Sequence, residues 1–180
     1  MAQTPREESL LGAWQGRRPP SAKWFDAAIE QAPERSRYPS DGATIELLTW
    51  GERGKPGLLF LHGNGAHADW WSFITPFFAS EYRCAAISWS GMGGSDWRSA
   101  YSIDGFAREL LGAIDHAGLA DVAPPIAIGH SFGGVPLMYA AVHHAEQIAG
   151  GIMVDSFVPP PERRARGWEV SGRPLPRYAS

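Results

Sequence analysis

The feature that most constrains this chain is a serine between two glycines, Gly129-x-Ser131-x-Gly133, placed after a short apolar run and before a helical stretch. Residues 127–133 read Ala-Ile-Gly-His-Ser-Phe-Gly. Glycines at this spacing let a chain turn sharply from a strand into a helix, so that the serine hydroxyl stands clear of the sheet. The pattern therefore predicts a serine presented at a tight strand-to-helix turn.

From residue 58 onward, short apolar runs alternate with helical stretches. Strands of a sheet that is covered on both faces are apolar along their whole length, and the candidates here are 58–61, 84–87, 126–128 and 152–154. The alternation predicts an α/β fold with a mostly parallel sheet and helices on both faces.

Three helices are expected between these runs. The clearest has Ser102 as its N-cap and Gly118 as its stop, with Ile103, Phe106, Leu110 and Ile114 on one face. A second is expected over Phe73–Ser80 if Pro76 falls in its first turn, and a third over Phe132–Ala145.

The N-terminal part has weaker signals. Residues 1–20 are polar and end in Pro19-Pro20, which predicts a flexible arm. Ser21 is a candidate cap for a short helix that would place Trp24, Phe25, Ala28 and Ile29 on one face. Residues 43–50 favour a strand and 51–57 a turn, which would form a hairpin-like start to the sheet.

Length and composition indicate one soluble domain, since the chain has 180 residues and is 44% hydrophobic. We expect an arm at 1–20, a core at 21–158, and a Pro- and Arg-rich tail at 159–180. The formal net charge of −3 gives no basic face for nucleic acid. No apolar run reaches the ~20 residues of a membrane span, and the single cysteine fits a reducing compartment. We therefore expect a cytoplasmic protein that binds neither nucleic acid nor membrane.

A second motif, His62-Gly63-Asn64-Gly65, ends the first apolar run. A serine that transfers acyl groups needs N–H donors aimed at the oxyanion, one from the residue after the nucleophile and one from an earlier loop. Phe132 and Asn64 occupy those positions. Glycines at 63 and 65 would let the loop backbone approach a substrate carbonyl closely.

A third segment, Ser88-Trp89-Ser90-Gly91-Met92-Gly93-Gly94-Ser95, resembles the D-x-x-G-x-G-x-S loop of the α/β-hydrolases. Together with the two motifs above, it makes residues 41–161 similar to the first two-thirds of that fold, strands one through six. Ser88 stands where the family pattern has aspartate, so we expect a looser loop here.

The resemblance implies a family of esterases, lipases, lactonases and carbon–carbon bond hydrolases. Its dehalogenase and epoxide-hydrolase branches place aspartate at the nucleophile, so Ser131 argues against those two branches. The resemblance also implies a triad of serine, acid and histidine, in that order along the chain.

No histidine follows Ser131 in a place that suits the triad base. His130 should point away from the serine. The resemblance implies that His62 braces the loop that bears Asn64. His143 and His144 lie roughly 18 Å along the helix at 1.5 Å per residue. His116 closes another helix, and nothing orients His67. We therefore expect the base to come from outside these residues.

The triad acid is open between two interpretations. Asp155 follows 152–154, on the same sheet edge as Ser131, and some family branches place the acid there. The other interpretation is a loop carboxylate that caps or braces the strand end.

Aromatic side chains near the same edge, Trp70, Trp71, Trp89 and Trp97, are candidates to line an apolar substrate pocket. No residue cluster has metal-ligand spacing and no loop has a nucleotide fingerprint, so we expect no metal and no cofactor. Residues 150–154 would form an exposed sheet edge, through which the chain could associate with itself. The tail at 159–180 resembles the start of a cap domain, or is a solvated tail.

Three hypotheses remain open at this stage. The first is a serine hydrolase for a small ester-like substrate, impaired in this chain by the absent histidine. The second is a non-catalytic binding protein with a hydrolase fold, and the third is an inert truncated fragment.

Overall fold

The protein is described by a computed structural model, which gives the structure of residues 12–156. Six strands form one sheet in the order β1-β2-β4-β3-β5-β6. Their bounds are β1 (Glu34–Ser40), β2 (Ala43–Trp50), β3 (Gly57–Leu61), β4 (Arg83–Ser88), β5 (Ile126–His130) and β6 (Gly150–Val154). The last four strands run parallel, and β1 and β2 are antiparallel to their neighbours. The predicted α/β fold with a mostly parallel sheet is confirmed.

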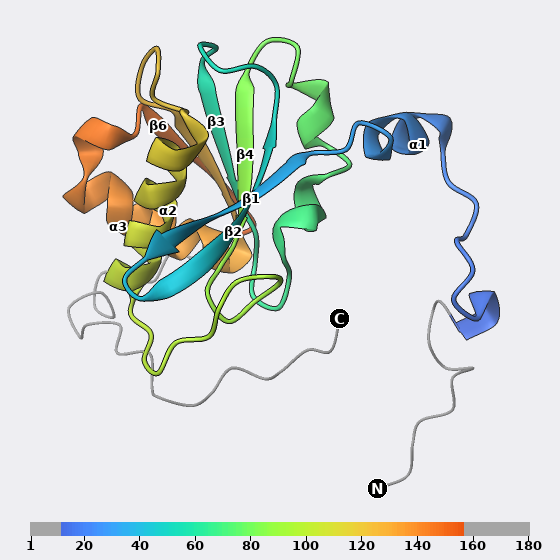
Figure 1. Ribbon diagram of the computed structural model, residues 1–180, viewed down its shortest axis with the longest axis horizontal. Coiled ribbons are helices and arrows are strands. Elements are labelled where there is room, and N and C mark those ends of the chain that lie inside the picture. The colour runs from blue at the N-terminus through green and yellow to red at the C-terminus, as the bar shows by residue number, and fades with distance from the viewer. Residues whose placement is uncertain (1–11, 157–180) are drawn as a thin grey trace, which may run out of the picture.

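Within residues 12–156, three α-helices and several single 3₁₀ turns precede or connect the strands. The helices are α1 (Lys23–Ile29), α2 (Ile103–Ala117) and α3 (Gly134–His143). The 3₁₀ turns are η2 (Gly12–Trp14), η3 (Ala68–Trp71), η4 (Thr75–Phe77), η5 (Ser131–Gly133) and η6 (Ala145–Gln147). Figure 1 shows α2 and α3 on one side of the sheet, and η3, η4 and α1 on the other.

Side chains alternate between two buried clusters because successive residues of a strand face opposite sides of the sheet. In β3, Leu59 and Leu61 pack toward α2 and α3, while Leu58 and Phe60 pack toward η3. Cys84 of β4 is buried on the η3 side, and burial raises the pKa of its thiol to about 12. Both faces of the central strands are therefore covered, which explains why they are apolar along their length.

The ends of α2 confirm the sequence prediction. The Ser102 hydroxyl accepts a hydrogen bond from the Gly105 N–H at 3.0 Å, and Gly118 adopts the left-handed conformation (φ 66°) that ends the helix. Glycine suits that position because it has no Cβ to clash.

Two helix predictions need correction. Residues 73–80 do not form an α-helix, because single 3₁₀ turns bring Trp71 and Phe78 onto Phe60, with ring centroids 5.3 and 6.0 Å away. The N-cap of α1 is Ala22 and not Ser21. The Ser21 hydroxyl instead donates a hydrogen bond to the Asp26 carboxylate at 2.6 Å.

The hairpin also lies elsewhere than expected. Strand β2 pairs with β1 through the turn at Asp41 and Gly42, and its other neighbour is β4 rather than β3. Asp41 and Gly42 both have positive φ, 45° and 77°, as a tight two-residue hairpin turn requires. Because β1 consists mostly of polar residues, its sequence carries no apolar strand signal.

The described residues include most of the expected core and only part of the expected arm. Of the arm at 1–20, residues 1–11 lie outside the described residues, and the tail at 159–180 lies wholly outside them. Within the described part, β6 has no neighbour on its outer side, and Ile152 and Val154 are exposed. None of the helices in residues 12–156 has the length and apolarity needed to span a membrane.

Candidate active site

Ser131 lies at the junction of β5 and η5 with φ of 50°, in the left-handed region that non-glycine residues rarely adopt. Gly129 and Gly133 must both be glycine, because other backbone atoms lie where a Cβ would stand. A Cβ on Gly129 would lie 2.7 Å from the Gly133 oxygen, and one on Gly133 would lie 2.5 Å from the Leu61 oxygen. The motif therefore forms a strained, tightly packed turn that presents a half-buried serine at the carboxyl edge of the sheet.

The loop after β3 packs directly against this turn. A Cβ on Gly63 would lie 3.1 Å from the Ser131 Cβ, so a side chain there would crowd the serine. Gly65 adopts a positive φ of 73°, and the side chain of the intervening Asn64 is exposed. Within the described residues, the amides of Asn64 and Phe132 donate to no acceptor. Two free N–H groups thus belong to the two segments that meet at Ser131.

His62 joins this loop to the one after β4. Its Nδ1 hydrogen-bonds the Gly63 carbonyl at 2.7 Å, and its Nε2 accepts from the Trp89 N–H at 3.1 Å. The Trp89 indole in turn donates to the His62 carbonyl at 3.0 Å. These partners fix a neutral ring with the proton on Nδ1. The imidazole is engaged at both nitrogens, so it braces the loop.

Burial lowers the pKa of His62 to about 4 from its usual 6.5. The hydrogen bond to Gly63 raises it in part, as does Glu46, while His67 and His130 lower it further. The folded protein therefore holds this ring neutral over a pH range in which the unfolded chain protonates it.

This shift makes stability fall in mild acid. Because the unfolded state binds more protons, the contribution of His62 is complete above pH 6.5 and is lost as the pH falls toward 4. Between pH 7.5 and 4.5 we expect the loss of about 2 kcal/mol in unfolding free energy, measured by urea denaturation. His62→Gln should remove this share of the pH dependence, and an identical slope in both proteins would contradict the assignment.

All six histidines lie within residues 12–156, and none hydrogen-bonds the Ser131 hydroxyl. The His130 ring stacks on Trp70, with centroids 5.9 Å apart and planes at 18°, and its Nδ1 is buried without a partner in the described residues. His67 lies 3.5 Å from Asp69, which also pairs with Arg35. Of the remaining three, His116 and His143 are exposed and His144 is half-buried.

Asp155 follows β6 at the same carboxyl edge of the sheet. It is exposed, has a positive φ of 48°, and makes no hydrogen bond or ion pair with any described residue. Its neighbour Ser156 donates to the Gly129 carbonyl at 3.2 Å, which ties the segment after β6 to the serine turn.

The four candidate pocket tryptophans differ in exposure. Trp70 and Trp97 are each 50% exposed, and Trp71 is buried against Phe60. Trp89 is completely buried, with Phe106 and Phe132 against its ring, so it is a core residue and does not line an open pocket. The sequence did not indicate that Trp89 is buried, because the segment that follows this residue is rich in glycine.

Ser88 ends β4, and the absence of the family's aspartate there does not loosen the segment, contrary to expectation. Ser88 is buried and hydrogen-bonds Glu46 and the Ala68 amide. The sequence analysis did not identify Glu46, whose only signal is that it is the one charged residue in 43–50.

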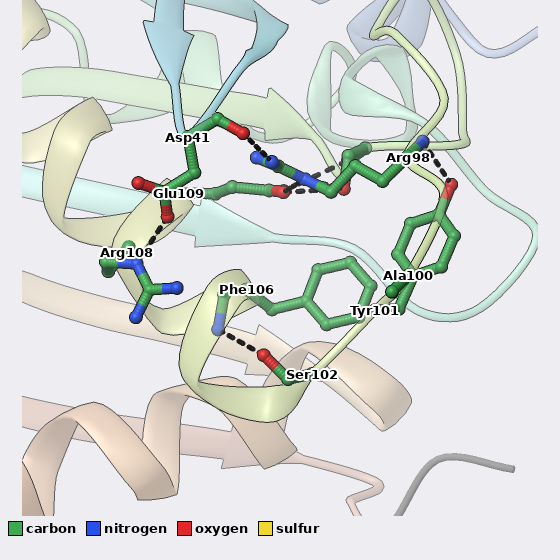
Figure 2. Close-up of a pocket in the computed structure, with 10 residues that line it drawn as sticks. Asp41, Arg98, Ala100, Tyr101, Ser102, Phe106, Arg108 and Glu109 are labelled. Carbon is green, nitrogen blue, oxygen red and sulfur yellow. Dashed lines mark hydrogen bonds and ion pairs between the residues drawn. The ribbon is translucent and has the colours of Figure 1, made fainter. Parts of the chain in front are cut away.

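A pocket of about 80 Å³ lies beside α2, and Ser131 is not among its lining residues. Figure 2 shows its polar side chains engaged with one another. Arg98 donates to the buried Glu109 carboxylate at 2.9 Å and to the Asp41 carbonyl at 2.7 Å. Burial raises the pKa of Glu109, and hydrogen bonds from Ser90 and Arg98 oppose that rise. These groups fasten α2 to the β1–β2 turn. Among residues 12–156, no group of three or more metal-ligating side chains gathers.

Comparison with known proteins agrees with this architecture. Residues 58–180 match the profile of the Alpha/beta hydrolase family, so the chain belongs to that family. It is 30% identical over 122 residues to Epoxide hydrolase 4 of Mus musculus, and 29% identical over 114 residues to Lipase LipV of Mycobacterium tuberculosis. The solved thioesterase domain from the curacin biosynthetic pathway superposes with a TM-score of 0.64 at 27% identity, covering 74% of this chain and 50% of that one.

The matches cover only part of each relative. They include 66% of this chain but 33% of the epoxide hydrolase, and 63% of this chain but 42% of the lipase. The chain thus spans less than half the length of these two relatives.

Proposed function

We propose that this chain carries the nucleophile and oxyanion site of a serine hydrolase that acts on an ester or a similar acyl substrate. The observation that supports this most is the position of Ser131, held at a φ of 50° on a turn whose glycines leave no room for side chains. Strain at a non-glycine residue persists only where the surroundings enforce it, and such residues cluster at active sites. The amides of Asn64 and Phe132 on the adjoining segments, unused as donors within the described part, add the second element.

In the proposed reaction, a base removes the Ser131 proton while Oγ attacks the substrate carbonyl carbon. The carbonyl π electrons move to oxygen, and the Asn64 and Phe132 amides stabilise the resulting negative charge. The tetrahedral intermediate collapses, the alcohol leaves with the proton from the base, and an acyl-serine remains. Water then attacks the acyl group with the same base, releasing the acid and restoring the serine.

We propose that the base is none of the six histidines of this sequence, because within the described residues none of them hydrogen-bonds the Ser131 hydroxyl. We propose that a histidine of the natural polypeptide outside these 180 residues, or of a partner chain, supplies it. Asp155 remains the candidate acid, because it lies on the same sheet edge and its carboxylate has no other partner in the described part.

For the substrate, we propose a small molecule with an apolar acyl or aromatic group beside the exposed Trp70 and Trp97. The lipase and thioesterase among the similar proteins act on acyl compounds by their names. Epoxide hydrolase 4 is equally similar, but the epoxide-hydrolase branch is expected to have aspartate where this chain has Ser131. The site therefore favours acyl transfer. We also propose that the chain associates with itself through the β6 edge and that the protein is cytoplasmic.

A fluorophosphonate probe tests the function. Incubated with the natural polypeptide, it should form a covalent adduct on Ser131, located by peptide mass spectrometry, and Ser131→Ala should remove the label. Labelling elsewhere, or substrate binding with no labelling at all, would overturn the proposal in favour of a non-catalytic binding protein. Aggregation without either would favour an inert fragment.

A further inference from the structure

Ser88, at the carboxyl end of β4, is fully buried beneath two loops. Its hydroxyl accepts a hydrogen bond from the Ala68 amide at 3.0 Å and donates to the Glu46 carboxylate at 2.6 Å. Ala68 begins η3, directly after the loop that bears Asn64. The hydroxyl therefore links the oxyanion loop to strand β2.

Glu46 reaches this point because it lies directly across from Ser88 in the pairing of β2 with β4. The carboxylate oxygen that accepts from Ser88 also accepts from the Gly94 amide at 3.0 Å. The other oxygen lies 3.7 Å from an Arg35 guanidinium nitrogen. One carboxylate oxygen thus fastens both β4 and the glycine-rich segment after it.

The surrounding packing leaves little freedom. A Cβ on Gly93 would lie 2.4 Å from the Ser88 hydroxyl and 2.8 Å from the His67 Cβ. The loops after β3 and β4 are therefore in direct contact around the Ser88 hydroxyl, at the opposite end of the Asn64 loop from the His62 bridge to Trp89.

From this we infer that Glu46 is a positioning residue for the proposed hydrolase reaction, acting through Ser88 to set the loop that carries the Asn64 amide. The α/β-hydrolase pattern has an aspartate at the end of this strand, where the present chain has Ser88. Here the carboxylate is supplied by Glu46 on the neighbouring strand β2. The inference rests on the proposed function, and its test includes a readout that does not.

The test compares Glu46→Leu with Glu46→Gln. Leucine removes the shared acceptor, leaving the Ser88 hydroxyl and the Gly94 amide without it, whereas the glutamine oxygen can accept from both. In the natural polypeptide, we expect Glu46→Leu to slow fluorophosphonate reaction at Ser131 by about 10- to 100-fold, because small displacements of oxyanion donors are costly. Glu46→Gln should react at a rate close to the unmodified protein, since only the partly exposed ion pair with Arg35 is lost.

The matched control is Thr49→Val, which removes a buried hydroxyl from the same strand without touching either loop. It should leave the labelling rate unchanged even if it lowers thermal stability. Ser88→Ala is the second variant if Glu46→Leu fails to fold, and it should slow labelling similarly.

Hydrogen exchange separates this inference from the proposed function. Peptides containing Ala68 and Gly94 should exchange at least about tenfold faster in Glu46→Leu than in Glu46→Gln, whether or not the protein is a hydrolase. If the unmodified protein is not labelled at Ser131, the proposed function fails while the exchange result still tests the linkage. If it is labelled and Glu46→Leu reacts at the same rate, the positioning role is wrong.

Discussion

Replacing Ser131 with glycine should abolish ester hydrolysis and, at the same time, make the protein more stable by about 1 kcal/mol. The hydroxyl makes no hydrogen bond within the described residues, so its removal leaves no partner unsatisfied. A side chain at φ of 50° is strained, and glycine adopts that conformation without a Cβ penalty. Loss of a serine nucleophile costs up to about 10⁶-fold in kcat in a related mechanism.

Both quantities should be measured on the natural polypeptide, hydrolysis with a short-chain acyl ester and stability by urea denaturation. Ser80→Gly is the matched control, an exposed serine without positive φ. It should leave hydrolysis intact and slightly lower stability, because glycine gives the unfolded chain more freedom. If Ser131→Gly is less stable than the unmodified protein, the turn is not strained as described.

Replacing Gly133 with alanine should destabilise the protein by about 3 kcal/mol. The new Cβ would lie 2.5 Å from the Leu61 oxygen, 2.8 Å from the Leu61 carbonyl carbon and 2.9 Å from the His62 oxygen. These are backbone atoms of β3 and its following loop, which cannot rotate away as a side chain can. The clash must instead separate the serine turn from the loop that bears Asn64.

Gly150→Ala is the control for this prediction. No atom of the described residues lies within 4 Å of the point that the alanine Cβ would occupy, and Gly150 does not have a positive φ. Alanine there should therefore change stability by less than about 0.5 kcal/mol. Equal urea midpoints for the two alanine variants would show that the close packing around Gly133 is absent in solution.

The sequence predicted those parts of the molecule whose signals are local. The four parallel strands appear as apolar runs, of which β3 and β4 are buried on both faces, and α2 was bounded correctly by Ser102 and Gly118. The serine turn was also predicted from a local signal, the spacing of its two glycines. Gly129 is needed because the Gly133 backbone lies against it, and Gly133 because the Leu61 backbone of β3 does.

What the sequence did not predict depends on partners far away in the chain. Strand β1 is mostly polar, and pairing with β2 rather than apolar character makes it a strand. Glu46 and Ser88 are 42 residues apart, and only the register of β2 with β4 brings them together. Trp89 looked like a pocket residue from its place at a strand end, but the packing of α2 buries it.

The most direct test of the central claim is a crystal structure of the protein after reaction with a fluorophosphonate. We expect a covalent bond between the Ser131 oxygen and phosphorus, with the phosphonyl oxygen within hydrogen-bond distance of the Asn64 and Phe132 amides. An adduct on another residue, or a phosphonyl oxygen turned away from both amides, would contradict it.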